Sequence, residues 1–81
     1  MVRMDGAEAR KERIAQITRM IQANLNESKD AGYIRLKRTV AEIMIDMGLT
    51  KIKVMEYLQL LNDAGKFEIN EAEDKITRLA V

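Results

Sequence analysis

The sequence contains no cysteine and no histidine, and the two absences exclude several kinds of chemistry. Without cysteine the chain has no disulfide framework and no thiolate metal site. Without histidine it also lacks the other common zinc ligand and the most frequent general base. Carboxylates can still bind magnesium or calcium, but no loop collects them at ligand spacing, and the neighbouring acids Glu73 and Asp74 fall on a predicted turn. We therefore expect no metal, no cofactor and no catalytic residues, so that the protein is not an enzyme.

Proline is also absent, and the uninterrupted apolar runs are short. The lack of proline fits a compact unit made of short elements. No apolar run is long enough to cross a membrane, and the N-terminus lacks the hydrophobic segment that a signal peptide needs. We therefore expect a cytoplasmic protein without membrane contact.

What the sequence does contain is typical of one small globular domain. Its 81 residues are 47% hydrophobic and 33% charged, which lies well outside the composition of disordered chains. The net charge of +1 conceals an asymmetry, because residues 1–39 carry +4 and residues 40–81 carry −3. Any attraction to a polyanion is therefore expected from the first half. An ordinary solvated surface accounts for such a patch about as often as a nucleic-acid contact does.

The domain is expected to span residues 7–81, after a disordered tail of residues 1–6. A first helix is predicted from Ala7 to Asn26, with Asp5 as a candidate cap at its start. Its apolar residues recur at the spacing of one helical face. They are Ile14, Ile17, Met20, Ile21 and Leu25.

A short strand and a second helix are predicted next. Residues 33–36 alternate, so Ile34 and Leu36 are expected on one side of a strand. The helix over residues 37–47 is apolar most of the way round. Such a helix is either sandwiched between neighbours or offers a face to a partner, and in so small a domain we favour the sandwiched arrangement.

A tight corner joins the second helix to a third. Gly48 is expected to end the second helix in the left-handed conformation, and Thr50 to cap the third over residues 50–64. The predicted buried side of this helix consists of Val54, Leu58 and Leu61, with Tyr57 and Ala64 near its edge.

The C-terminal part of the sequence predicts a β-hairpin. Gly65 is expected to end the third helix, and residues 67–69 and 76–81 alternate like strands around a polar turn over residues 70–75. The strand over residues 33–36 is expected to pair at the hairpin edge. The result is an α+β, mainly helical fold with a small antiparallel sheet.

This order of helix, strand, helix, helix, strand, strand resembles the winged helix-turn-helix family. The resemblance covers residues 8–81 and includes a second-helix alanine, the glycine–apolar–threonine corner, the apolar positions of the third helix, its terminal glycine and the residue that opens the wing. In this sequence these positions are Ala41, Gly48, Leu49, Thr50, Val54, Leu58, Leu61, Gly65 and Phe67. The eight positions from Ala41 to Gly65 in register, followed by Phe67, make this a strong signal for the fold.

The resemblance implies binding to double-stranded DNA, with the 50–64 helix in the major groove. A transcriptional regulator, or another chromatin- or replication-associated DNA binder, is the function that this implies. The candidates for base and phosphate contacts are Met55 and Gln59 opposite the buried side, with Lys51 and Lys53 on the flanks. At the start of the second helix, Lys37 and Arg38 are the candidates for anchoring the DNA backbone.

Two features depart from the pattern of many DNA-binding relatives. Four acids surround the single lysine of the predicted wing tip: Glu68, Glu71, Glu73 and Asp74 around Lys75. The third helix contains no arginine, and it carries the acids Glu56 and Asp63 on its outer side.

Two further kinds of partner follow from the same residues. As an alternative to DNA binding, the family resemblance is compatible with a protein-interaction module in a replication or other multiprotein complex, with Ile52 and Met55 at the interface. A homodimer through the long amphipathic first helix is also expected, since DNA-binding modules of this kind often bind as dimers.

Overall fold

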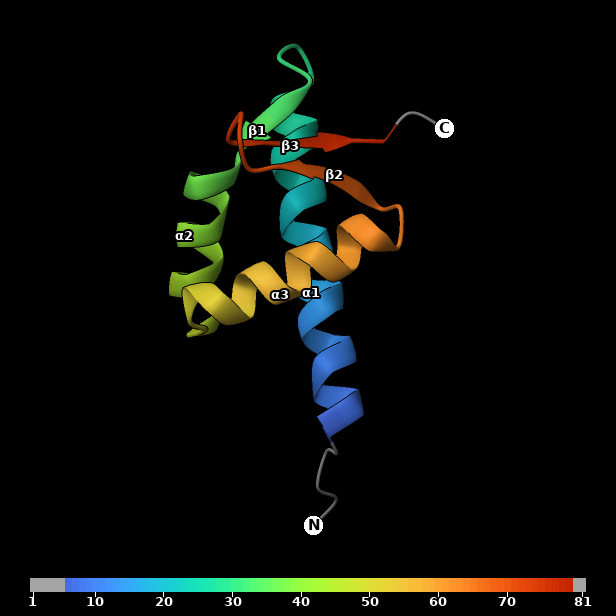
Figure 1. The fold of residues 1–81 in the computed structure, drawn as a ribbon, viewed down its shortest axis with the longest axis vertical. Helices are drawn as coiled ribbons and strands as arrows, with labels where there is room; N and C mark the ends of the chain where they lie inside the picture. Colours follow the sequence, from blue (N-terminus) through green and yellow to red (C-terminus); the bar gives the residue numbers. More distant parts are fainter. Residues whose placement is uncertain (1–5, 80–81) are drawn as a thin grey trace.

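A computed structural model of the chain describes residues 6–79. Its elements follow one another as helix, strand, helix, helix, strand, strand (Figure 1). They are α1 Gly6–Glu27, β1 Tyr33–Arg35, α2 Leu36–Met47, α3 Lys51–Asp63, β2 Phe67–Asn70 and β3 Lys75–Arg78. The predicted α+β, mainly helical class and element order are confirmed. Gly6 belongs to α1 and not to the expected tail, whereas Asp5 and the rest of that tail lie outside the described residues.

The three strands form one antiparallel sheet in the order β1-β3-β2. Ile34 of β1 and Ile69 of β2 both pair with Ile76 of β3, which is fully buried. The small sheet and the pairing of the first strand at the hairpin edge are therefore confirmed. β1 is one residue shorter than predicted because Leu36 starts α2. β3 ends at Arg78, and residues 80–81 of the predicted strand lie outside the described residues.

The core lies where α1 passes behind α3 and the sheet (Figure 1). The predicted stripe of α1 supplies three buried residues, while Ile14 and Met20 pack at its margin. The N-terminal part of α1 extends beyond the other elements (Figure 1). The buried apolar residues are Ile17, Ile21, Leu25, Ile34, Leu36, Val40, Ile43, Val54, Tyr57, Leu58, Leu61, Phe67 and Ile76.

The corner between α2 and α3 has the predicted local structure. Gly48 adopts φ 65° and its amide donates to the Met44 carbonyl at 2.9 Å, which ends α2 in the left-handed conformation. The Thr50 hydroxyl accepts from the Lys53 amide at 3.2 Å and so caps α3. Tyr57 is buried, not at the edge of the core, and Ala64 is exposed.

The expectation that α2 is sandwiched between neighbours is wrong. Its buried residues, Leu36, Thr39, Val40 and Ile43, all lie on one side. Ile45 projects from the other side and is 82% exposed. The domain has too few elements to cover a second face of this helix, so part of its apolar surface lies at the protein surface.

The β2–β3 turn is attached to the start of α2. The Asp74 carboxylate accepts from the Lys37 amide at 2.7 Å, and the Asp74 carbonyl accepts from the Leu36 amide at 3.1 Å. Asp74 itself has φ 57°, a left-handed conformation that aspartate tolerates better than most residues. Arg35 occupies the N-cap position of α2, but among the described residues its side chain makes no capping hydrogen bond. Asp74, from a distant part of the chain, takes over this role and caps α2.

Replacing Asp74 by alanine is expected to lower the free energy of unfolding by about 1–2 kcal/mol. The change removes the acceptor for the Lys37 amide, and alanine tolerates the left-handed conformation poorly. Asp74→Asn keeps an acceptor and a residue suited to this conformation, so it should lose less. Urea unfolding followed by circular dichroism measures both, with Glu71→Ala on the same turn as the control. Equal stability of the alanine variant and the wild type would show that this cap contributes nothing.

Candidate binding groove between α2, α3 and the β2–β3 turn

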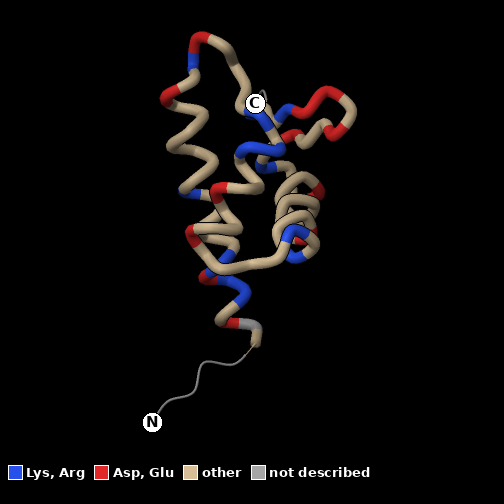
Figure 2. The backbone as a smooth tube through the Cα atoms, turned by 90° about the vertical axis from the view of Figure 1, so that its left-hand side faces the viewer, with Lys and Arg blue, Asp and Glu red and all other residues tan. Residues whose placement is uncertain are grey.

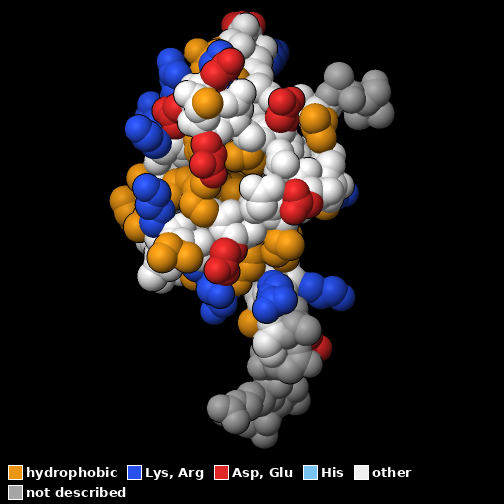
Figure 3. Space-filling model, in the orientation of Figure 1, with side chains coloured by type: hydrophobic (Ala, Val, Ile, Leu, Met, Phe, Trp, Pro, Cys, Tyr) orange, Lys and Arg blue, Asp and Glu red, His pale blue; other side chains and the backbone are white. Residues whose placement is uncertain are grey.

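A surface groove of about 450 Å³ lies between α2, α3 and the β2–β3 turn. Figure 3 shows hydrophobic side chains gathered on this face of the molecule, with carboxylates around them. The groove is lined by nine residues from the three elements. They are Leu36, Lys37, Val40, Ala41, Met44, Lys51, Met55, Glu71 and Asp74.

The floor of the groove is apolar and rests on the core. Val40 is buried, while Met44 and Met55 are partly buried and pack against the core cluster. Methionine is flexible and polarizable, so a floor of this kind adapts to the shape of an apolar partner. The floor can therefore accept side chains that a rigid aliphatic surface would reject.

Two exposed isoleucines extend this apolar surface beyond the groove. Ile45 lies four residues after Ala41 on α2, and Ile52 lies three residues before Met55 on α3, so each neighbours a groove residue on its own helix. Ile52 is 75% exposed, close to the value for Ile45. Scattered exposed apolar residues are common, but a pair that flanks an apolar groove is typical of an interaction surface.

The rim of the groove carries both signs of charge. Lys37 and Lys51 stand near the first turns of α2 and α3, and Glu71 and Asp74 stand on the β2–β3 turn. Figure 2 shows the acidic turn beside the basic start of α2. The first-turn amide of Lys37 already donates to Asp74, so the phosphate anchor expected at this helix N-terminus is occupied by a carboxylate.

The structure distributes the predicted nucleic-acid contacts over three separate hollows. Lys37, Lys51 and Met55 line the groove together. Arg38 lines a polar hollow between the end of α1, β1 and α2. Lys53 and Gln59 line a third hollow between the start of α1 and α3. The candidates therefore do not line one common hollow.

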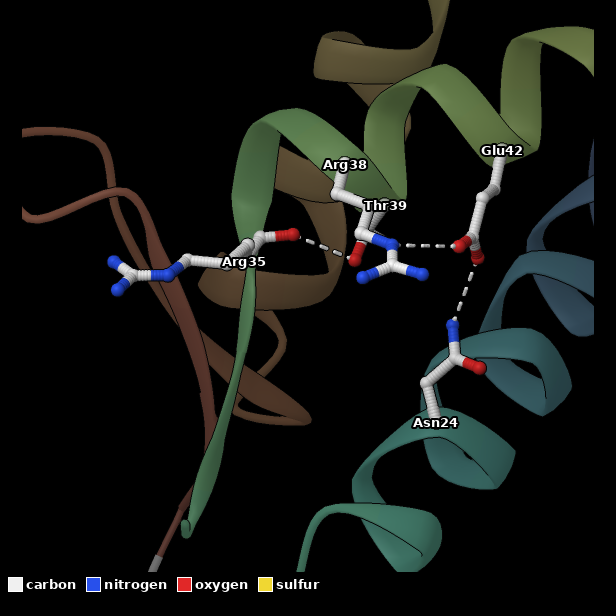
Figure 4. A network of polar contacts seen from close by, with 5 residues as sticks. All are labelled: Asn24, Arg35, Arg38, Thr39 and Glu42. Atoms are coloured by element: carbon white, nitrogen blue, oxygen red, sulfur yellow. Dashed lines mark hydrogen bonds and ion pairs between the residues drawn. The ribbon is translucent and has the colours of Figure 1, made fainter.

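Arg38 belongs to a network of polar contacts (Figure 4). Its Nε lies 3.5 Å from the Glu42 carboxylate, which also accepts from the Asn24 side chain at 3.2 Å. Arg38 is 83% exposed, so this pair contributes little stability. It does place a carboxylate beside the guanidinium that was expected to bind phosphate.

The polar residues on the outer side of α3 are paired with acids in a similar way. Lys53 lies 3.3 Å from the Glu56 carboxylate, and the Gln59 amide donates to Asp63 at 2.9 Å. A base edge would have to displace Asp63 before Gln59 could read it. These acids make the outer side of α3 a poor match for DNA.

Two contacts on the outer face of the sheet were not predicted from the sequence. The Tyr33 ring lies 4.6 Å from the Lys75 ammonium and 5.4 Å from the Arg35 guanidinium, which are cation–π distances. Lys75 also pairs with Glu73 at 3.4 Å. Cations on β1 and β3 are thus held against the sheet and not directed towards the groove.

Several groove residues were not predicted from the sequence. Leu36, Val40, Ala41, Met44 and Glu71 all line it, but none was a candidate. The apolar excess of the second helix was the available signal, because a helix with more apolar surface than one face can bury must expose some of it. The apolar content of the second helix does not predict that the β2–β3 turn also lines the groove.

The described part of α1 gives the expected homodimer no support. Its exposed residues are charged or polar, apart from Gly6 and Ala23. Stable homodimer interfaces are usually more apolar than this. Dimerisation through α1 stays a prediction that the structure does not favour.

No protein-family model matches the sequence, and no curated protein or solved structure is significantly similar to it. Within residues 6–79, none of the helices is long and apolar enough to cross a membrane. In the same part of the chain, acids do not cluster in threes as a metal ion would need.

Proposed function

We propose that this chain is a winged-helix protein-interaction module that binds another protein in the groove between α2, α3 and the β2–β3 turn, within a cytoplasmic complex. The observation that carries the proposal is the apolar floor formed by Val40, Met44 and Met55. Apolar surface in a concave site with a few charges at its rim suits a protein partner. The flanking Ile45 and Ile52 enlarge the area that a partner can cover.

Acids in the groove and on the outer side of α3 support a protein partner over DNA. Glu71 and Asp74 line the groove, and Glu56 and Asp63 pair with the polar residues of α3 that would contact bases. Each carboxylate that faces a phosphate costs affinity, because phosphate contacts dominate binding to DNA. A protein partner can instead supply cations opposite these acids.

DNA binding through the 50–64 helix is the second candidate function, as a transcriptional regulator or another chromatin- or replication-associated protein. One observation favours it: Lys37 and Lys51 from two different helices line the same groove. Two cations that converge in this way could hold one stretch of phosphate backbone. The two proposals differ in their dependence on salt.

A fluorescence-anisotropy titration with a mixed-sequence DNA duplex at low salt separates the two functions. A protein-interaction module should show no saturable binding to the duplex. DNA binding should instead be saturable and should weaken steeply with salt, with a slope of about −0.9 for each phosphate neutralised. Lys51→Ala should then reduce that slope, whereas Lys29→Ala in the loop after α1 should not. Saturable binding with this pattern would overturn the proposed protein-interaction function.

A further inference from the structure

We propose that the groove binds an amphipathic α-helix of a partner protein, and that this helix carries acidic residues along the edge that faces Lys37 and Lys51. The inference rests on the proposed function and specifies the partner of the same groove.

The sheet offers a partner strand little room, which favours a helix. β2 is an outer strand, but the Asn62 side chain accepts from the Ile69 amide at 2.8 Å and so occupies a donor on its open edge. β1, the other outer strand, has only three residues. Adding a strand to an edge requires a row of free backbone groups. The groove instead lies between two helices, where the apolar stripe of a third can pack.

The lysines at the rim determine the charge of the partner's edge. The ion pairs within residues 6–79 are Arg38–Glu42, Lys53–Glu56 and Lys75–Glu73. The ammonium groups of Lys37 and Lys51 are in none of them, so these are the groove cations whose side chains lack a carboxylate partner in the described part of the chain. Both lie near helix N-termini, where the helix dipole adds positive potential. Acidic side chains on a bound helix supply the missing partners.

The acids of the groove exclude a simple polyanion. Glu71 and Asp74 stand on the β2–β3 turn, which is attached to the start of α2 beside Lys37, so a ligand that is negative on every side would be repelled there. A helix can present acids to the ammonium groups of Lys37 and Lys51 while the side chains that face Glu71 and Asp74 stay neutral or basic. Its apolar stripe would lie on Val40, Met44 and Met55, the floor of the groove.

The test uses three synthetic helical peptides with the same stripe of leucines at i, i+3, i+4 and i+7. One edge of the stripe carries glutamate, lysine or glutamine, and all remaining positions are identical. We expect the glutamate-edged peptide to bind about fivefold more tightly than the lysine-edged one, with the glutamine-edged peptide between them. Anisotropy titration gives the affinities. The methyl signals of Met44 and Met55 in NMR spectra report whether the groove is the site.

Charge reversal at Lys51 provides the matched comparison. Lys51→Glu places an acid in the first turn of α3, where it is tolerated, so the protein should fold normally. It should abolish or reverse the preference for the glutamate-edged peptide. Lys29→Glu makes the same charge change outside the groove and should leave the preference intact.

Two results would overturn the inference in distinguishable ways. If all three peptides shift the Met44 and Met55 methyl signals with equal affinity, the groove binds helices but the acidic edge is wrong, and the proposed function stands. If no peptide shifts them, a helix is not the occupant. Saturable, salt-sensitive binding to duplex DNA in that case would remove the proposed function as well.

Discussion

Replacing Leu58 by alanine is expected to lower the free energy of unfolding by about 2–5 kcal/mol. Leu58 is fully buried in the middle of α3, where that helix packs on the core. Truncation removes apolar contacts and leaves a cavity that a close-packed interior cannot fill. A domain of this size has only about 4–12 kcal/mol of stability, so the variant should be largely unfolded at moderate urea concentrations.

Leu60 provides a matched control two residues further along the same helix. It is 47% exposed, so Leu60→Ala makes the same chemical change without opening a cavity. We expect this variant to lose less than about 1 kcal/mol. Urea unfolding followed by circular dichroism measures the free energy of unfolding of both variants. An unchanged slope m of that free energy against urea concentration shows that unfolding is still two-state. Equal losses in the two variants would contradict the packing of α3 described above.

The α2–α3 corner could be predicted from sequence because its interactions are local. Gly48 closes a hydrogen bond to Met44, and Thr50 caps the amide of Lys53, so each contact spans three or four residues. Residue preferences at such positions depend on the backbone and hardly at all on the rest of the fold. The buried stripes of α1 and α3 were predictable for a similar reason, since helical periodicity is itself a local property.

The cap on α2 could not be predicted, because Asp74 lies 37 positions after the amide that it accepts from. In the sequence, Asp74 is one of several acids on the predicted turn between the last two strands. There it was interpreted only as a difference from the pattern of many DNA-binding relatives. The structure gives it a specific role in attaching the turn to α2. The same contact places one wall of the groove, so the groove was as hard to foresee as the contact itself.

The exposure of individual apolar residues also depends on long-range packing. Periodicity placed Ile52 and Met55 together on the outer side of the third helix. Ile52 is exposed, but Met55 turns towards α2 and is partly buried against the core. Ile45 and Ile43 lie on the same apolar helix, yet only Ile43 has a neighbour to pack against. Which apolar residues a short helix exposes follows from the number of elements available to cover it.

Replacing Ala41 by glutamate is expected to weaken binding of the glutamate-edged peptide by about tenfold or more. Ala41 lines the groove and is exposed, so the larger side chain fills space that the partner needs. Glutamate at this position also lies four residues after Lys37, where it can pair with that lysine along the helix. The variant thus removes apolar surface, obstructs the groove and neutralises one of the two cations.

The stability of the Ala41→Glu variant should change by less than about 1 kcal/mol, because glutamate forms helices well and the position is exposed. Ala23→Glu on the exposed side of α1 is the matched control and should leave peptide binding unchanged. Anisotropy titration of both variants measures the affinities, and urea unfolding shows that both are folded. If the two variants bind the peptide equally well, the groove is not the binding surface. If Ala41→Glu alone loses binding, the occupant lies along α2 at Ala41.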